Sequence, residues 1–191
     1  RKPTATLPPS ASMNTSANDR NTMTDLFQYN RRQTTEVNVG SIRMGSNNPI
    51  RIQSMATTNT NDTEASVQQA IRIIQAGGEL VRFTTQGTRE AENMRNINAG
   101  IRERGFLTPI VADVHFNANV ADVAARYAEK VRINPGNYVD PARKFEKISY
   151  TDEEYAQEIK KIESRLVPLL DICKANHTAL RIGVNHGSLS D

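Results

Sequence analysis

Cysteine, tryptophan and long apolar runs are scarce or missing in this sequence. A single cysteine, Cys173, stands among 191 residues, which excludes an internal disulfide framework and a CxxC metal motif within them. It follows an apolar helical run (Leu166, Leu169, Leu170), so we expect a packed thiol rather than a nucleophile. No run reaches the roughly 18 apolar residues that a membrane span requires, so we expect no membrane partner.

A large excess of positive or negative charge is also lacking. The 24 Lys+Arg and 21 Asp+Glu residues give a net charge of +3, and most of that excess falls within residues 1–40. A nucleic-acid binder would gather basic residues on one face with aromatic residues between them. Aromatic residues make up only 5% of the chain, so we expect no nucleic-acid partner.

The chain opens on a segment with almost no large apolar residues. Residues 1–24 are rich in Ser, Thr, Asn and Pro, and we expect a disordered leader over residues 1–34. A transit peptide is the less favoured interpretation. The sequence V-N-V-G-S-I-R-M at Val37–Met44 then alternates around a Gly-Ser turn, which predicts a small β-hairpin placed to plug the bottom of a barrel.

From residue 50 onward, apolar strands alternate with amphipathic helices. We expect strands at Ile50–Met55, Glu79–Thr85, Pro109–Phe116, Lys130–Asn134 and Ala179–Asn185, and helices at Glu64–Gln75, Thr88–Arg104, Ala118–Glu129 and Asp152–Ala175. The pattern fits either a doubly wound sheet or a (β/α)8 barrel. No Gly-x-Gly-x-x-Gly motif follows the first strand, and all five strands end in polar residues, which favours the barrel.

The predicted fold is therefore α/β, a partial (β/α)8 TIM barrel in which residues 35–191 supply about five of the eight strands. Since a barrel cannot close with five strands, we expect the chain to be the N-terminal part of a longer protein. Without its remaining strands, such a chain would expose an apolar edge.

Three of the predicted strands carry an arginine where a buried parallel strand is normally apolar: Arg82, Arg132 and Arg181. A guanidinium there is unfavourable unless an anion meets it, and its planar donors match phosphate or carboxylate oxygens. Each arginine either pairs with an internal Asp or Glu or helps to bind an anionic ligand. The shared layout of the three favours a ligand with several charges.

Period-two alternation brings further polar side chains to the same face. Asp113 and His115 are candidates for positioning or proton transfer, and a purely structural Asp–His hydrogen bond is an equal alternative. His177 is expected to be solvated and Arg51 to be structural or solvent-reaching. The backbone of Gly187 and Ser188 would cradle an oxyanion. The other residues expected on the shared face are Gln53, Met55, Thr84, Gln86, Asn134, Gly183 and Asn185.

Four motifs together resemble the 4-hydroxy-3-methylbut-2-enyl diphosphate synthase family of the methylerythritol phosphate route to isoprenoids. They are I-Q-S-M-A-T-T-N-T-N-D-T at Ile52–Thr63, V-A-D-V-H-F at Val111–Phe116, V-R-I-N-P-G-N at Val131–Asn137 and R-I-G-V-N-H-G-S-L at Arg181–Leu189. The long connection Tyr138–Lys174 is similar to that of the three-domain members. The resemblance implies an N-terminal TIM barrel that binds 2-C-methyl-D-erythritol 2,4-cyclodiphosphate.

By motif match, the resemblance also implies roles for single residues. The diphosphate ligands would be Arg82, Arg132, Asn134, Arg181, Asn185, Gly187 and Ser188; Asp113 and His115 would line the site as candidate catalytic residues; Gln53, Ser54 and Thr84 would line the substrate pocket. A lysine expected at the anion site is not found among the motifs.

The resemblance further implies a [4Fe-4S] cluster, held by three cysteines and a glutamate in a C-terminal domain, with ferredoxin or flavodoxin as electron donor. Residues 1–191 would bind no cofactor, because Cys173 cannot hold a cluster by itself, and we expect them to be inactive alone. A homodimer is compatible with this interpretation. We expect a bacterial cytoplasmic location, with the plastid stroma as the alternative. Two other functions stay open: a pteroate synthase-like barrel transferase and a non-catalytic anion-binding module.

Overall fold

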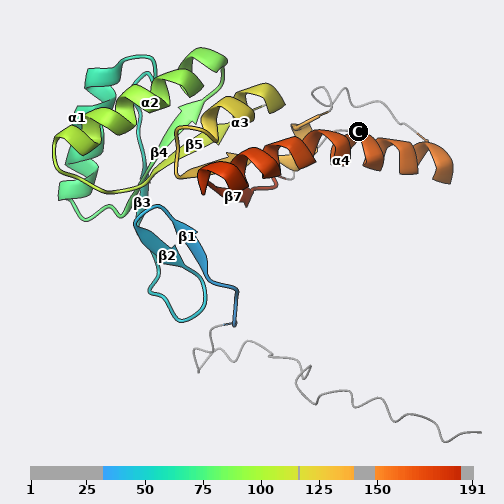
Figure 1. Cartoon of the computed structure of the whole chain (residues 1–191), viewed down its shortest axis with the longest axis horizontal. Helices are drawn as coiled ribbons and strands as arrows, with labels where there is room; N and C mark the ends of the chain where they lie inside the picture. The colour runs from blue at the N-terminus through green and yellow to red at the C-terminus, as the bar shows by residue number, and fades with distance from the viewer. Residues whose placement is uncertain (1–31, 116, 140–148, 186–191) are drawn as a thin grey trace, which may run out of the picture. The chain divides into compact units, whose positions relative to one another are not determined.

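Five short parallel strands form the centre of the molecule (Figure 1). The structure is a computed structural model that describes residues 32–115, 117–139 and 149–185. Each strand pairs with the next one along the chain, in the order β3-β4-β5-β6-β7, so β3 and β7 are the edges of an unclosed sheet. The strands are β3 (Gln53–Met55), β4 (Leu80–Thr85), β5 (Ile110–Val114), β6 (Lys130–Ile133) and β7 (Ala179–Ile182).

Four helices alternate with these strands and pack side by side in sequence order, α1 on α2, α2 on α3 and α3 on α4 (Figure 1). They therefore cover one face of the sheet, as the outer helices of a β/α barrel do. The main core lies between the two layers and includes Val81, Phe83 and Ile133 from the strands and Met94 and Ile97 from α2. The helices are α1 (Thr63–Gln75), α2 (Thr88–Glu103), α3 (Ala118–Ala124) and α4 (Asp152–Asn176), with a short 3-10 helix η1 (Pro135–Asn137) after β6.

Local capping explains where the helices begin. The Asp62 side chain accepts a hydrogen bond from the Ala65 backbone N–H at the start of α1, as an acidic N-cap residue does. Thr151 and Glu154 form a reciprocal capping box at the start of α4. These signals lie within a few residues of the helix that they start, which is why the sequence located the helix starts well.

The predicted hairpin is present as β1 (Val37–Val39) paired antiparallel with β2 (Ile42–Met44). It packs at the amino-terminal ends of the parallel strands, where Val39 joins Leu80 and Val111 in a small second core. Gly40 turns the hairpin with a φ of +53°, and a Cβ on it would come within 2.8 Å of the Glu129 side chain. The hairpin therefore covers the lower end of the strand face that the helices leave open, as the sequence predicted.

The predicted end of helix α3 was wrong. The helix ends at Ala124, whereas the sequence predicted an end at Glu129. The chain turns at Ala125–Tyr127 through shorter i→i+3 hydrogen bonds such as Tyr127 N–H to the Ala124 carbonyl. The Thr178 hydroxyl, from the distant start of β7, contacts the carbonyl oxygens of Ala125 (2.6 Å) and Ala128 (3.1 Å). A tertiary contact thus satisfies groups that would otherwise favour a longer helix.

The strands are also shorter than predicted, at one or both ends. Ile50 and Ile52 precede β3 and are largely exposed rather than part of a core strand. The predicted end of the third strand, Phe116, lies outside the described residues. The leader expected over 1–34 also lies almost wholly outside them, and the compact unit that carries the sheet begins at Thr34.

Candidate functional site

The strand face opposite the helices carries the polar side chains that the alternation predicts. Backbone pairing sets Thr84 beside Asp113, Asp113 beside Arg132, and Arg132 beside Arg181 across four neighbouring strands. Residues in register across parallel strands point to the same side of a sheet, and the residues that alternate with these belong to the helix-facing core. The inner face of the strands therefore gathers charged groups in one row.

Asp113 is the centre of this row and is almost wholly buried. One carboxylate oxygen, Oδ2, accepts from Arg82 Nη2 at 2.5 Å and lies 3.1 Å from His115 Nε2. The other, Oδ1, accepts from Arg132 Nη1 at 3.2 Å. Two of the three strand arginines thus pair with an internal carboxylate, which was the structural alternative from the sequence, and both pair with the same one.

The guanidinium of Arg132 is held from a second side. Its Nη2 donates to the Gly183 carbonyl oxygen at 2.9 Å, and its side chain is only 7% exposed. A Cβ on Gly183 would lie 2.5 Å from Arg132 Nε, closer than a Cβ atom comes to a non-bonded neighbour. Gly183, directly after β7, therefore leaves room for the Arg132 side chain. The hydrogen bonds to Asp113 and to the Gly183 carbonyl oxygen fix the orientation of this side chain.

Arg82 and Arg181 keep N–H groups that are available to a ligand. Arg82 Nε is buried and has no hydrogen-bond partner among the described residues. Arg181 is exposed, and its guanidinium makes no hydrogen bond or ion pair within 32–115, 117–139 and 149–185. Since guanidinium groups bind anions through several N–H donors at once, these two side chains can still receive an anion while Asp113 keeps Arg82 and Arg132 in place.

Lys130 is a member of the inner face that the sequence analysis did not single out. It lies two residues before Arg132 on β6, on the same face, is buried, and places Nζ 3.9 Å from the Met44 sulfur of the hairpin. Burial lowers the pKa of this ammonium, and the charges of Arg181 and Arg82 lower it further. The signal for it was present, because a lysine two residues before a strand arginine must share its face.

The remaining predicted ligands have different surroundings. The Asn134 side chain is buried and its Oδ1 accepts from the Gly136 N–H at 3.2 Å, which shapes the turn after β6. Asn185 is exposed beyond β7. Gly187 and Ser188 lie outside the described residues, so the proposed backbone cradle stays a prediction. His177 is exposed and ends α4 with a φ of +55°, and Arg51 forms an ion pair with Glu79 at 2.7 Å, as expected for solvated and structural residues.

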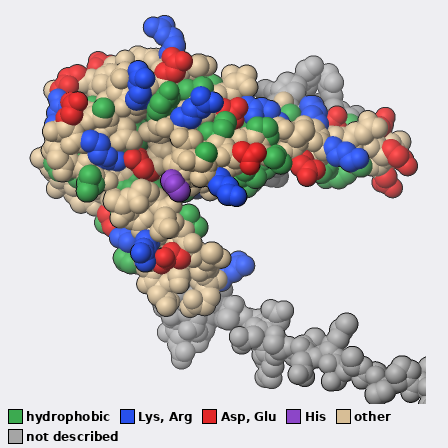
Figure 2. Space-filling view, viewed as in Figure 1, with side chains coloured by type: hydrophobic (Ala, Val, Ile, Leu, Met, Phe, Trp, Pro, Cys, Tyr) green, Lys and Arg blue, Asp and Glu red, His purple; other side chains and the backbone are tan. Residues whose placement is uncertain are grey.

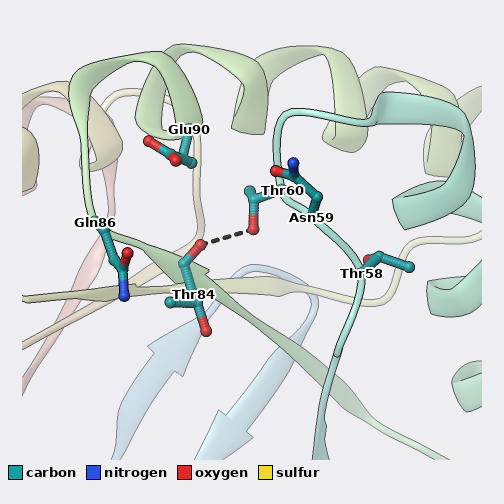
Figure 3. A pocket seen from close by; sticks show the side chains of 6 residues that line it. All are labelled: Thr58, Asn59, Thr60, Thr84, Gln86 and Glu90. Atoms are coloured by element: carbon teal, nitrogen blue, oxygen red, sulfur yellow. Dashed lines mark hydrogen bonds between the residues drawn. The ribbon is translucent and has the colours of Figure 1, made fainter.

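A small polar pocket of about 180 Å³ opens at the carboxyl ends of β3 and β4 (Figure 3). The Thr60 hydroxyl donates to the Thr84 carbonyl oxygen at 2.7 Å and ties the loop after β3 to β4. Gln53 is in β3 on the inner face, whereas Ser54 pairs in register with Val81 of the helix-facing core and so lies on the opposite face. The pocket is lined by Thr58, Asn59, Thr60, Thr84, Gln86 and Glu90.

The described residues contain no group of three or more His, Cys, Asp or Glu side chains that could hold a metal ion. Cys173 is a free thiol buried in the main core, and this burial raises its pKa, in agreement with the packed thiol predicted. An iron–sulfur cluster needs several thiolate ligands, so the residues present do not fit one.

The outer surface differs from the inner strand face in its charge. On the side shown in Figure 2, Lys and Arg side chains are interspersed with Asp and Glu, whereas the inner face sets Lys130 and three arginines against the single carboxylate of Asp113. Among the helices of the described ranges, none has the length and apolar character needed to cross a membrane.

These features define an α/β domain of the β/α-barrel type with a cluster of cations on its inner strand face. Residues 34–191 match the model of the GcpE TIM-barrel domain, and the chain belongs to this family. The family match favours the diphosphate synthase resemblance over the pteroate synthase-like alternative.

Two curated relatives that the chain resembles carry the name 4-hydroxy-3-methylbut-2-en-1-yl diphosphate synthase (flavodoxin). The chain is 71% identical over 167 residues to the protein of Phocaeicola vulgatus and 70% identical over 167 residues to that of Bacteroides thetaiotaomicron. Each alignment covers 87% of this chain and 27% of the relative. The chain thus spans about a quarter of the length of these relatives.

Two solved structures of dihydropteroate synthase are also similar in part. The enzyme from Vibrio fischeri has a TM-score of 0.44 and 16% identity, over 81% of this chain and 68% of that one. The enzyme from Burkholderia cenocepacia has a TM-score of 0.47 and 14% identity, over 82% and 66%.

Proposed function

We propose that this chain binds a cyclic diphosphate on its inner strand face and is the substrate-binding part of a 4-hydroxy-3-methylbut-2-en-1-yl diphosphate synthase. The observation that carries the proposal is the excess of cations around one carboxylate. Asp113 engages Arg82 and Arg132, while Arg181 and Lys130 have no carboxylate partner in the described part of the chain. A ligand with two phosphates would supply the missing negative charge.

Within this proposal, Asp113 is a positioning residue and the arginines are the ligands. A buried ion pair contributes little net stability because both charges lose water, so a stability role alone is a weak reason for three arginines on neighbouring strands. Two guanidiniums fixed by a shared carboxylate are already ordered when the anion arrives. Less conformational entropy is then lost on binding.

The reaction that we propose for the longer protein is the reductive opening of 2-C-methyl-D-erythritol 2,4-cyclodiphosphate. The names of the relatives support flavodoxin as the electron donor, with ferredoxin as the alternative. The family resemblance supports a [4Fe-4S] cluster, but this chain with its single cysteine does not supply the ligands. We therefore assign to these residues only the binding and orientation of the substrate. We also propose a cytoplasmic location for the protein, as is usual for a bacterial biosynthetic enzyme.

Calorimetric titration of the intact protein with the cyclodiphosphate, without a reductant, tests the proposal. Arg132→Ala should weaken binding by about 1.5–3 kcal/mol, the typical contribution of a hydrogen bond to a charged group. Arg181→Ala should weaken it as well, and because Arg181 is exposed and unpaired in the described structure, its loss should leave the fold intact. The matched control is Arg126→Ala, an exposed arginine in the turn after α3.

Thermal unfolding of each variant separates loss of binding from loss of folding. If Arg181→Ala and a folded Arg132→Ala both bind the cyclodiphosphate as tightly as Arg126→Ala, the inner face is not the substrate site and the proposal is wrong.

A further inference from the structure

The polar pocket at the carboxyl ends of β3 and β4 lies next to the charged row formed by Arg82, Asp113, Arg132 and Arg181. Thr84, which lines the pocket, pairs in register with Asp113 and follows Arg82 by two residues on β4. Neighbouring strands lie about 4.8 Å apart, and two residues of a strand span about 6.6 Å. A ligand whose phosphates meet the arginines therefore has this pocket of about 180 Å³ directly beside it.

Hydrogen bonds between its walls hold the pocket open (Figure 3). The Thr60 hydroxyl donates to the Thr84 carbonyl oxygen at 2.7 Å, and the Asn93 amide donates to the Thr60 carbonyl oxygen at 2.7 Å. The Glu90 carboxylate accepts from the Asn61 amide and from the backbone N–H at the N-cap of α2, both at 3.0 Å. The walls are thus ordered before a ligand arrives, which lowers the entropy lost on binding.

Two exposed amides on these walls keep hydrogen-bonding groups for a ligand. The Gln86 side chain makes no hydrogen bond within the described residues. The Asn59 oxygen accepts from the Asn61 N–H at 3.0 Å, whereas the Asn59 amide N–H groups have no partner in the part of the chain that the structure describes. Figure 3 shows Gln86 beside Glu90 on one side of the pocket, and Asn59 beside Thr60 on the other.

The lining favours an alcohol group over other ligands. A phosphate would meet the like charge of Glu90, and an apolar group would find no aliphatic or aromatic side chain larger than a threonine methyl. Glu90 is the one carboxylate of the lining, and the described residues hold no metal-binding group of three. A hydroxyl both donates and accepts, as the amide side chains do, so it can bond to them and to a carboxylate.

We propose that this pocket binds the free hydroxyl groups of the cyclic diphosphate, with Gln86 and Asn59 as hydrogen-bonding ligands and Thr60 as a positioning residue. The inference rests on the proposed function, because the arginines must hold the phosphates nearby. It adds specificity to that site. Arginines alone would bind any diphosphate, whereas the pocket distinguishes a diphosphate ester that carries hydroxyl groups from inorganic pyrophosphate.

Calorimetric titration of the intact protein with the cyclodiphosphate and with pyrophosphate tests the inference. Pyrophosphate has no carbon-bound hydroxyl group, so it reports on the arginines alone. Gln86→Met and Asn59→Ser should each weaken cyclodiphosphate binding about three- to tenfold, as for one neutral hydrogen bond, and leave the pyrophosphate affinity unchanged. Serine keeps an oxygen for the turn after β3 and removes the amide.

The matched control is Gln75→Met, an exposed glutamine at the end of α1, which lies toward the opposite end of the strands. Both pocket residues are exposed, so the thermal midpoints of their variants should equal that of the control. If either variant binds the cyclodiphosphate like Gln75→Met, the pocket holds only water and the inference is overturned. An equal loss of affinity for both ligands would also overturn it, because the amides would then act at the phosphates.

Arg181→Ala in the same titrations keeps the two proposals apart. It should weaken the binding of the cyclodiphosphate and of pyrophosphate alike. If it weakens neither, the proposed anion site fails, whereas a failure confined to Gln86→Met and Asn59→Ser leaves the anion site standing and removes only the hydroxyl pocket.

Discussion

Replacement of Asp113 by asparagine tests whether one carboxylate holds the inner face together. The change keeps the shape of the side chain and removes its charge. Oδ1 can still accept from one guanidinium, but the new amide N–H groups would face the N–H donors of the other arginine. Arg82 and Arg132 would then repel each other across a nearly buried space, where their side chains are 22% and 7% exposed.

The magnitude follows from the number and exposure of the contacts. Removing one partner from a buried ion pair typically lowers the free energy of unfolding by about 3–5 kcal/mol. Asp113 has two guanidinium partners, at 2.5 and 3.2 Å, but Arg82 retains access to water and the asparagine side chain would keep one acceptor. We therefore expect a loss near the lower limit, about 3 kcal/mol.

Urea denaturation of the natural protein and of Asp113→Asn measures this loss directly. Asp171→Asn, on the exposed side of α4, is the matched control and should change the unfolding free energy by less than about 0.5 kcal/mol. Pyrophosphate should restore part of the lost stability of Asp113→Asn, because it brings negative charge back to both arginines. A loss below about 1 kcal/mol, with no effect of pyrophosphate, would refute the central role of Asp113.

Two further changes test packing around the same strands. Gly183→Ala should displace the Arg132 guanidinium, which lies 2.5 Å from the position of the new Cβ, and weaken cyclodiphosphate binding about tenfold or more in calorimetry; an unchanged affinity would show that the arginine can move without consequence. Cys173 should resist a thiol reagent such as Ellman's reagent in the folded protein and react on unfolding, because burial raises its pKa and leaves little thiolate; rapid native labelling would contradict the packed thiol.

The order and type of the elements were readable from the sequence because their signals are local. Short apolar runs that end in polar residues indicated all five parallel strands, and amphipathic spacing indicated the four helices between them. The end of α3 was misplaced because it depends on a hydroxyl of Thr178, about 50 residues later in the chain. Such a contact leaves no trace in the local pattern.

The site was readable only in part. Alternation correctly placed Arg82, Asp113 and Arg132 on one face, because side-chain direction in a strand is a local property. It did not show that one carboxylate would engage both arginines, since that depends on the register between strands. Lys130 was overlooked although its place on this face follows from the same alternation; only its contact with Met44, 86 residues away in sequence, could not be predicted from the local pattern.

The sequence by itself thus determined the strand and helix pattern, the shared face of the arginines, and the resemblance that the GcpE domain match confirmed. All of these are properties of residue order along the chain. Only the tertiary structure decided which charges meet: Asp113 between Arg82 and Arg132, Arg181 without a partner in the described residues, and Lys130 enclosed by the hairpin. Electrostatic interactions fall off with distance and depend on access to water, and both are set by residues that are far apart in the chain.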